Sequence, residues 1–145
     1  MACLAWIAGE VMGVHMFKEW RDHFLFLVNE WGMEGPSIAR YAGVETMTYI
    51  GDTVAIEIEC EMRERRVFVL IVKLEEGQLP EDYYVSNGEV VRLHLPKLLS
   101  LCAGGSPRDY VSRHADLESQ AQDYAGLLKT YADCVHRSEM WMRNV

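Results

Sequence analysis

One stretch of nine residues constrains the fold more than any other part of this 145-residue chain. From Val54 to Met62 every even-numbered position is apolar, and such alternation is typical of a strand that is buried on one face. Three of the positions between are glutamates: Glu57, Glu59 and Glu61. The charged run Arg63–Arg66 indicates a turn, and Val67–Leu74 is the expected returning strand. The sequence therefore predicts an antiparallel hairpin over Thr53–Leu74.

A turn centred on Arg63 and Glu64 fixes the cross-strand register of this hairpin. The predicted pairs are Glu61 with Arg66, Glu59 with Phe68, Glu57 with Leu70 and Ile58 with Val69. One face of the hairpin is then wholly apolar and belongs to the core. The other face mixes the three glutamates with Phe68, Leu70 and Val72. Such a mixed surface must be partly covered, either by another element of this chain or by a partner.

Helical patterns flank the hairpin on both sides. Apolar residues recur at helical spacing over Met16–Trp31, and Gly32 follows as a helix stop. A short helix is expected over Pro96–Cys102. A long C-terminal helix begins at Ser106 or, after a break, near Ala115. The predicted fold is α+β, an antiparallel sheet of four to five strands with the N- and C-terminal helices packed mainly on one face.

The remaining strands are expected on either side of the hairpin. A first strand lies within Ser37–Ile50, and Asn87-Gly88 is a strong hairpin-turn dipeptide between Tyr83–Ser86 and Glu89–Leu95. In the second arm of that turn, Arg92 and His94 point away from the core. Residues 1–145 are expected to form a single domain. For residues 1–15 three interpretations stay open: a helix extension, packing on a sister chain, or extra sequence before a natural start at Met12 or Met16.

The negative charge of the chain is concentrated in its middle. The net charge is −8, and between Glu45 and Glu89 eleven acidic residues stand against four basic ones. This distribution argues against a nucleic-acid-binding face, because phosphate contacts need Lys and Arg, and it suits a basic protein partner. A solvated sheet face that keeps the protein soluble is the simpler explanation and is favoured over a partner. No run of about 18 apolar residues is present, so no membrane span is expected.

The four cysteines are scattered and form no CxxC pair. Cys60 and Cys102 lie inside expected core elements, where we interpret them as small hydrophobic residues. Free thiols of this kind favour a reducing, cytoplasmic location.

The sequence contains no signature of an enzyme, cofactor or metal site. Nucleophile, phosphate-loop and dinucleotide motifs are absent. His15, Glu19 and His23 share one side of a helix, but the two histidine Cα atoms would be about 12 Å apart, too far to bind one ion. His94 and Arg92 lie near Glu57 or Glu59, where an ordinary salt bridge is favoured over general acid–base catalysis. A non-enzymatic role without cofactor or metal is therefore favoured.

Three segments together resemble a known type of protein. They are the step Asn29-Glu30-Trp31-Gly32, the acidic strand Asp52-Thr53-Val54-Ala55-Ile56-Glu57-Ile58, and the closing helix with Asp123-Tyr124-Ala125, Leu127-Leu128 and Tyr131-Ala132. Over Phe17–Arg137 the chain resembles small bacterial α+β proteins, among them toxin-immunity proteins of polymorphic and contact-dependent systems and proteins carried on mobile gene cassettes. The resemblance implies an immunity or antitoxin-type inhibitor and carries over no site residues.

Two kinds of site follow from these patterns. The leading hypothesis is a protein-binding module that occludes a basic partner through its acidic sheet face. The residues expected to contact this partner are Glu57, Glu59, Glu61, Phe68, Leu70 and Tyr83. The alternative is a small-ligand binder or enzyme with a pocket between helices and sheet, where Trp20, Trp31, Tyr83, Arg92 and His94 meet. A homodimer formed through a sheet edge or the N-terminal apolar segment is compatible with both.

Overall fold

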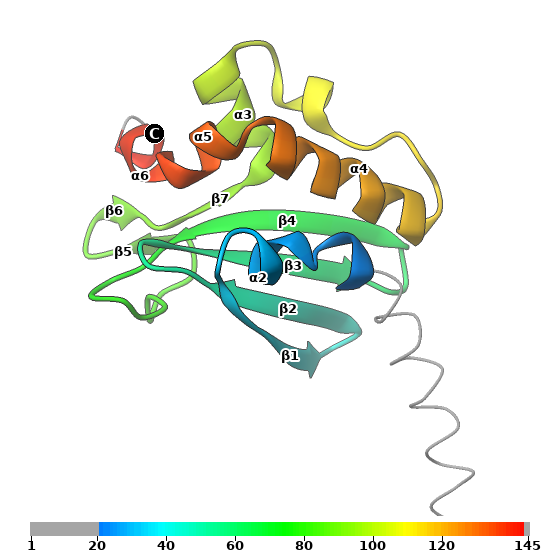
Figure 1. The fold of residues 1–145 in the computed structure, drawn as a ribbon, viewed down its shortest axis with the longest axis horizontal. Helices are drawn as coiled ribbons and strands as arrows, with labels where there is room; N and C mark the ends of the chain where they lie inside the picture. The colour runs from blue at the N-terminus through cyan, green and yellow to red at the C-terminus, as the bar shows by residue number, and fades with distance from the viewer. Residues whose placement is uncertain (1–20, 144–145) are drawn as a thin grey trace, which may run out of the picture.

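The computed structural model describes residues 21–143 as an antiparallel sheet covered by helices (Figure 1). The sheet has the strand order β1-β2-β3-β4-β7, and β5 and β6 form a separate two-stranded ribbon. The strands are β1 (Glu34–Tyr41), β2 (Val44–Ile50), β3 (Val54–Glu61), β4 (Arg66–Lys73), β5 (Val85–Ser86), β6 (Glu89–Val90) and β7 (Arg92–His94). The helices are α2 (Phe26–Asn29), α3 (Leu95–Ala103), a 3₁₀ turn (Pro107–Tyr110), α4 (Leu117–Thr130), α5 (Ala132–His136) and α6 (Ser138–Met142). The predicted α+β class is confirmed.

The helices gather on one face of the sheet, where they bury the main core (Figure 1). Ile56, Ile58 and Ile71 of the sheet are fully buried there with Leu98 of α3 and Leu128 of α4. The helix α2 joins the same layer, because Lys129 of α4 lies over the Phe26 ring, 4.7 Å from its centroid. None of the helices in residues 21–143 is long and apolar enough to cross a membrane.

The central hairpin has the register that its sequence predicts. β3 and β4 pair Glu61 with Arg66, Glu59 with Phe68, Glu57 with Leu70 and Ile58 with Val69. Strict alternation excludes a shift by one residue, which would turn every side chain to the other face, and the position of the turn selects this register among the rest.

The expected first strand is in fact a hairpin. β1 and β2 pair antiparallel around Ala42 and Gly43, whose φ angles are 52° and 80°. Positive φ at both central residues is the geometry of a tight hairpin turn, which Asn-Gly or Asp-Gly usually signals. Alanine seldom adopts a positive φ angle, so the sequence does not indicate a turn at this position.

The expected N-terminal helix is interrupted in its described part. Arg21–His23 is helical, Phe24 and Leu25 form a turn, and α2 then adds four residues. Gly32, with φ at 69°, ends this segment as expected. The remainder of the predicted helix, Met16–Trp20, lies outside the described residues.

The C-terminal helix begins after a break. Ser106 and Asp109 form a capping box around the short 3₁₀ turn, and α4 starts at Leu117 with the Asp116 carboxylate accepting from the backbone N–H of Ser119. Tyr131 marks a bend between α4 and α5.

The interpretation of Cys102 as a small core hydrophobe is wrong. Cys102 of α3 and Cys134 of α5 form a disulfide, with 5.9 Å between their Cα atoms. The pairing depends on helix packing across 32 residues, which no local pattern reveals. It also removes these two cysteines from the argument for a reducing location. Cys60 is free and buried, as expected.

Candidate functional site

The second face of the sheet is covered in part by the chain itself, through the loop segment 79–86 rather than a helix. The Arg92 Nε atom donates to Glu57 Oε1 at 2.7 Å, and both side chains are only 9% exposed. Arg92 Nη1 donates in turn to the backbone carbonyls of Asp82 at 3.0 Å and Tyr83 at 2.8 Å. The Arg92 guanidinium therefore links segment 79–86 to Glu57 of the sheet through hydrogen bonds.

Electrostatics support this attachment. Burial by itself lowers the pKa of Arg92, but the hydrogen bond and the charge of Glu57 outweigh it, so the pKa is raised and the guanidinium stays charged. The Arg92 guanidinium also lies 4.5 Å from the centroid of the Tyr83 ring. Such a cation–π contact adds to the attraction because the ring face is negative.

Two stacked tyrosines lie on top of this loop. The Tyr83 and Tyr84 rings are 4.5 Å apart between centroids. The Tyr83 hydroxyl donates to Glu59, while the Tyr84 hydroxyl lies 3.1 Å from His94 Nε2. Burial, followed by the hydrogen bond to Glu59, raises the pKa of Tyr83, so its hydroxyl keeps its proton. Both rings are thus fixed by the sheet beneath them.

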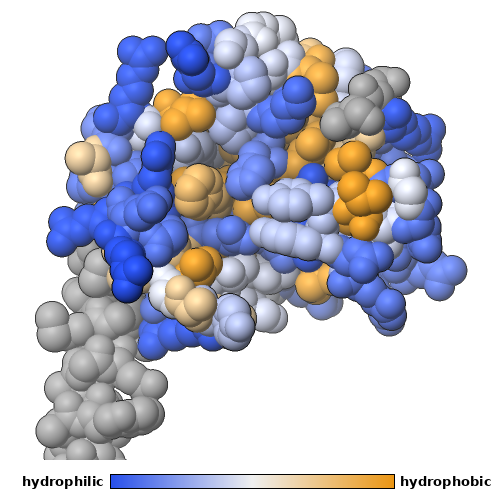
Figure 2. Space-filling model, turned by 180° about the vertical axis from the view of Figure 1, so that it is seen from behind, coloured by the Kyte–Doolittle hydropathy of each residue, from blue (hydrophilic) through white to orange (hydrophobic). Residues whose placement is uncertain are grey.

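An exposed apolar and aromatic surface results, which we call the tyrosine patch. It consists of Leu79, Tyr83, Tyr84 and Val85. Tyr83 is 41% and Tyr84 47% exposed, and the acidic residues Glu81 and Asp82 are their neighbours in sequence. Figure 2 shows the molecule from behind, with weakly polar and apolar side chains standing among hydrophilic ones on this side.

The structure divides the six residues expected to contact a partner. Glu57 and Leu70 are buried and offer no surface to another protein. Glu59 and Phe68 are half-buried near the loop, Glu61 is half-buried at the far end of β3, and Tyr83 is exposed. The six residues did not include Tyr84, although the sequence already suggested the pair Tyr83-Tyr84, beside Glu81 and Asp82, as a plausible protein-contact patch.

The structure separates the described residues that were expected to line a pocket between helices and sheet, and of these His94 lines a groove between β4 and α4. Trp31 packs on the helix side against Phe26 and His136, with centroid distances of 5.2 and 4.5 Å. Tyr83 and Arg92 lie on the opposite face of the sheet. Strand alternation puts them there, because Arg92 pairs with Val72 and shares its face with Glu57. Trp20 lies outside the described residues, as do His15 and Glu19.

The groove lined by His94 has a volume of about 610 Å³ and lies along the first half of β4. Its opposite wall is the segment Val111–Ala115, and Tyr124 and Gln120 of α4 contribute to its lining. We call it the basic groove after six of its lining residues: Arg65, Arg66, His94, Lys97, Arg113 and His114. Glu64 is the single acidic residue that the described part of the chain adds to the lining.

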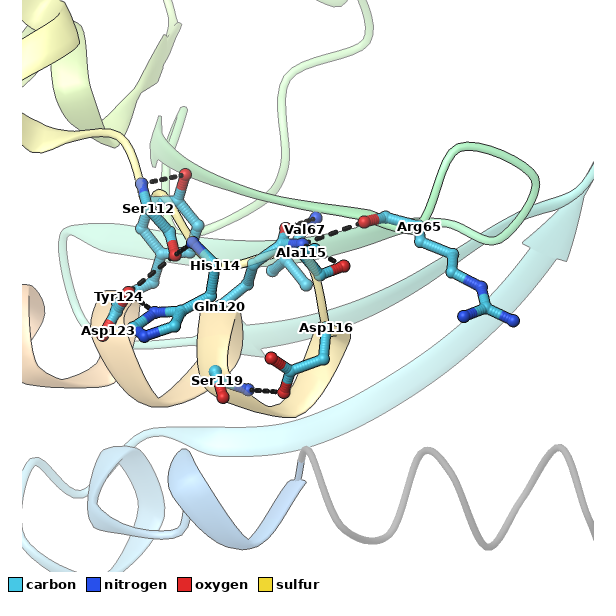
Figure 3. A network of polar contacts seen from close by, with 10 residues as sticks. All are labelled: Arg65, Val67, Ser112, His114, Ala115, Asp116, Ser119, Gln120, Asp123 and Tyr124. Carbon is cyan, nitrogen blue, oxygen red and sulfur yellow. Dashed lines mark hydrogen bonds and ion pairs between the residues drawn. The ribbon is translucent and has the colours of Figure 1, made fainter.

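The groove exists because β7 is shorter than β4. Pairing between the two strands ends at Leu70 with His94, so Arg66–Val69 has no strand neighbour on that side. The Gln120 side chain takes the place of one (Figure 3): its Oε1 accepts from the Val67 N–H and its Nε2 donates to the Arg65 carbonyl, both at 2.9 Å. A buried side-chain amide thus reproduces one step of a β-ladder.

A second polar network lies in the wall of the groove (Figure 3). Asp123 Oδ2 accepts from Ser112 Oγ at 2.6 Å and lies 2.7 Å from His114 Nδ1. Burial raises the pKa of Asp123, but the hydrogen bonds to Ser112 and His114 lower it further than burial raises it. The carboxylate therefore stays ionised and orients the imidazole.

This network does not have the arrangement of a nucleophile relay. Ser112 donates its hydrogen bond to the Asp123 carboxylate and not to His114, so the serine–imidazole–carboxylate order of such a relay is not formed by these three residues. The network holds the His114 imidazole in place in the wall of the groove. Sequence reasoning missed the groove because its cations come from three separated segments, and Arg63–Arg66 was interpreted only as a turn.

Comparison of the chain with protein families, with curated proteins and with solved structures found no match in any of the three.

Proposed function

We propose that this protein is a non-enzymatic protein-binding module that occludes a basic partner through the tyrosine patch. The carrying observation is the stacked Tyr83–Tyr84 pair, which is exposed yet held by hydrogen bonds to Glu59 and His94. Tyrosines are enriched among the residues that dominate binding energy at interfaces. Here they carry little side-chain entropy to lose, since the sheet already fixes their rings.

The surroundings of the patch indicate the charge of the partner. Segment Glu45–Glu89 carries eleven acidic residues against four basic ones, and it includes the whole loop 79–86. An acidic rim around an aromatic centre favours lysine- or arginine-rich partners, mainly by steering their encounter and excluding wrong ones. Phe68 and the Glu59 carboxylate lie at the margin and complete the proposed contact surface.

The inhibitor role extends this proposal. The sequence resemblance to bacterial immunity proteins and mobile gene cassettes supports a partner that is a toxin encoded beside this gene. Such a partner is a basic enzyme whose substrate is anionic, because an acidic surface then competes for the same site.

The test uses the product of the neighbouring gene. Binding to the purified full chain is measured by calorimetry at two salt concentrations, for the wild type, Tyr84→Ala and Tyr41→Ala. Tyr41 is the control because it is a tyrosine 86% exposed on β1, remote from the loop in sequence. We expect Tyr84→Ala to weaken binding by about 30-fold or more, as for a hot-spot residue, and Tyr41→Ala to leave it unchanged.

Two results would contradict the proposal. One is binding that Tyr84→Ala leaves intact, which would place the interface elsewhere. The other is an affinity that does not change between the two salt concentrations, since salt screens the attraction between an acidic surface and a basic partner.

A further inference from the structure

We propose that the basic groove binds a small organic anion, a molecule with an apolar body that carries a carboxylate or phosphate group. The groove carries the opposite charge to the tyrosine patch, with Phe68 and His94 at the border between them, and its ligand does not depend on the function proposed for the patch.

The lining holds cations that lack counter-charges. Arg65, Arg66, Lys97 and Arg113 all line the groove, and none of them forms an ion pair within the part of the chain that the structure describes. By contrast, Arg40, Lys73, Arg92 and Arg143 each contact a carboxylate. In a chain of net charge −8 this is a local excess of positive charge. Like charges around a hollow repel one another, and a bound anion relieves that repulsion.

The floor of the groove is apolar. Phe68, Val69, Pro96 and Tyr124 lie between the charged groups. A hollow of about 610 Å³ falls within the usual range of small-molecule sites, in which apolar walls bury the body of a ligand and a few polar groups orient it. An inorganic ion alone would leave this apolar surface in contact with water.

The edge of β4 excludes the obvious macromolecular occupant. An extended acidic peptide would bind here by adding a strand to the open edge. The Gln120 side chain already occupies that edge, because it bonds the Val67 N–H and the Arg65 carbonyl. Adding a strand would require breaking both buried hydrogen bonds. A small ligand that contacts side chains alone leaves them in place.

The His114 imidazole is held in one orientation. Its Nδ1 lies 2.7 Å from Asp123 Oδ2, and Asp123 is itself held by Ser112 at 2.6 Å. The contact with Asp123 thereby occupies Nδ1, which leaves Nε2 to contact a ligand. The His114 imidazole and four cations from three segments thus converge on one hollow, in which paired N–H donors suit a carboxylate or phosphate.

The test is a titration of the ¹⁵N-labelled full chain followed by NMR, with phenyl phosphate and benzoate as the two anionic probes. Benzyl alcohol is the neutral probe with a similar aromatic ring, and inorganic phosphate is the anionic probe without an apolar group. We expect phenyl phosphate or benzoate to bind with a dissociation constant of about 1 mM or tighter and to shift the amides of Val67, Val69 and Val111–His114. Whichever of phenyl phosphate and benzoate binds more tightly identifies the preferred anionic group. Benzyl alcohol and inorganic phosphate should both bind at least about tenfold more weakly.

Variants separate the groove from general electrostatic attraction. Lys97→Gln and Arg113→Gln should each weaken binding of the anionic probe by about tenfold, the usual loss for one charge-assisted hydrogen bond. Arg137→Gln is the control, because Arg137 is an exposed cation at the C-cap of α5 and does not line the groove. The wild type and the variants should have superimposable spectra before ligand is added.

Three outcomes would overturn the proposal. The first is no shift of groove amides by either anionic probe. The second is equal binding of benzyl alcohol, or equal losses in Arg137→Gln and Arg113→Gln. The third is an aspartate- and glutamate-rich peptide that binds the groove more tightly than both aromatic anions, which would make the site a peptide-binding edge.

Discussion

The Arg92 side chain lies nearly buried between the sheet and segment 79–86 and uses three of its nitrogen atoms there. Nε and Nη2 donate to the two Glu57 oxygens, and Nη1 donates to the carbonyls of Asp82 and Tyr83. The local pattern predicted that Arg92 points away from the core, near Glu57 or Glu59, and the structure pairs it with Glu57. Strand alternation did not predict that segment 79–86 covers Arg92, because the Asp82 and Tyr83 carbonyls come from a loop without regular periodicity.

We therefore expect Arg92→Met to destabilise the fold by about 3–5 kcal/mol, because the change leaves the Glu57 carboxylate buried without its counter-charge. Chemical denaturation measures this free energy. Arg143→Met, which breaks an exposed ion pair with Glu139 on α6, is the matched control and should cost less than about 0.5 kcal/mol. In the double variant Glu57→Leu with Arg92→Met much of the stability should return, because two apolar side chains replace the pair. Equal effects of Arg92→Met and Arg143→Met would show that the buried pair is not formed.

Cys60 gives a second prediction at the scale of one side chain. It is fully buried, and burial followed by the charges of Glu45 and Glu61 raises the pKa of its thiol. The thiolate is the nucleophile in alkylation, so Cys60 should stay unmodified by iodoacetamide in the native protein at pH 8 and react once the chain is unfolded. Peptide mass spectrometry measures the labelled fraction at this residue. Rapid native labelling would mean that β3 is not covered as described.

At the scale of elements, the Gln120 side chain hydrogen-bonds α4 to the edge of the sheet. Its amide replaces the strand neighbour that β7 fails to supply. The apolar stripe of α4 is visible in the sequence, and Leu117, Ala121, Tyr124 and Leu128 are buried as the stripe requires. Gln120 is buried beside them. Helical periodicity reveals only the apolar positions of a helix, so the sequence did not indicate that Gln120 hydrogen-bonds to the edge of β4.

Replacing Gln120 tests this contact. Gln120→Ala leaves the Val67 N–H and the Arg65 carbonyl without partners, and we expect a loss of about 2–4 kcal/mol in the free energy of unfolding. Gln120→Glu restores an acceptor for Val67 but has no donor for Arg65 when ionised, so it should also destabilise. Gln122→Ala, at an exposed position of the same helix, is the control and should change stability by less than about 0.5 kcal/mol. Slower backbone exchange at Val67 in Gln120→Ala than in the wild type would contradict this account.

At the scale of the whole molecule, the sequence predicts the class and the central hairpin register because both follow from a strict period of two. Prediction from the sequence fails where residues that are far apart in the chain come into contact. The basic groove joins Arg65 and Arg66 to Lys97 and Arg113, and the disulfide joins Cys102 to Cys134. Helix packing creates both juxtapositions, and neither has a local pattern. The β1–β2 turn was missed for another reason, the unusual positive φ of Ala42.

The disulfide and the groove are linked by topology. Cys102 and Cys134 close a loop of chain that contains the 3₁₀ turn, the segment Val111–Ala115 and all of α4, and so includes the groove wall that faces β4. With a sequence separation of 32, the cross-link restricts the unfolded chain by about 3–4 kcal/mol in the chain-entropy description. Its loss should therefore reduce stability without removing any side chain from the sheet.

Thermal unfolding followed by circular dichroism tests this, with and without a strong reductant. Because reduction frees the unfolded chain, we expect the wild-type midpoint to fall by about 10 °C on reduction. Cys102→Ala with Cys134→Ala should unfold near the lower temperature in both conditions, since it has no cross-link to lose. Binding of phenyl phosphate should weaken in the same variant, because the wall that carries Arg113 and His114 is then held only by packing and by hydrogen bonds such as those of Gln120 and Asp123. A wild-type midpoint that reductant leaves unchanged would mean that the two cysteines are not joined in solution, and these non-covalent contacts would then hold the groove wall in the wild type as well.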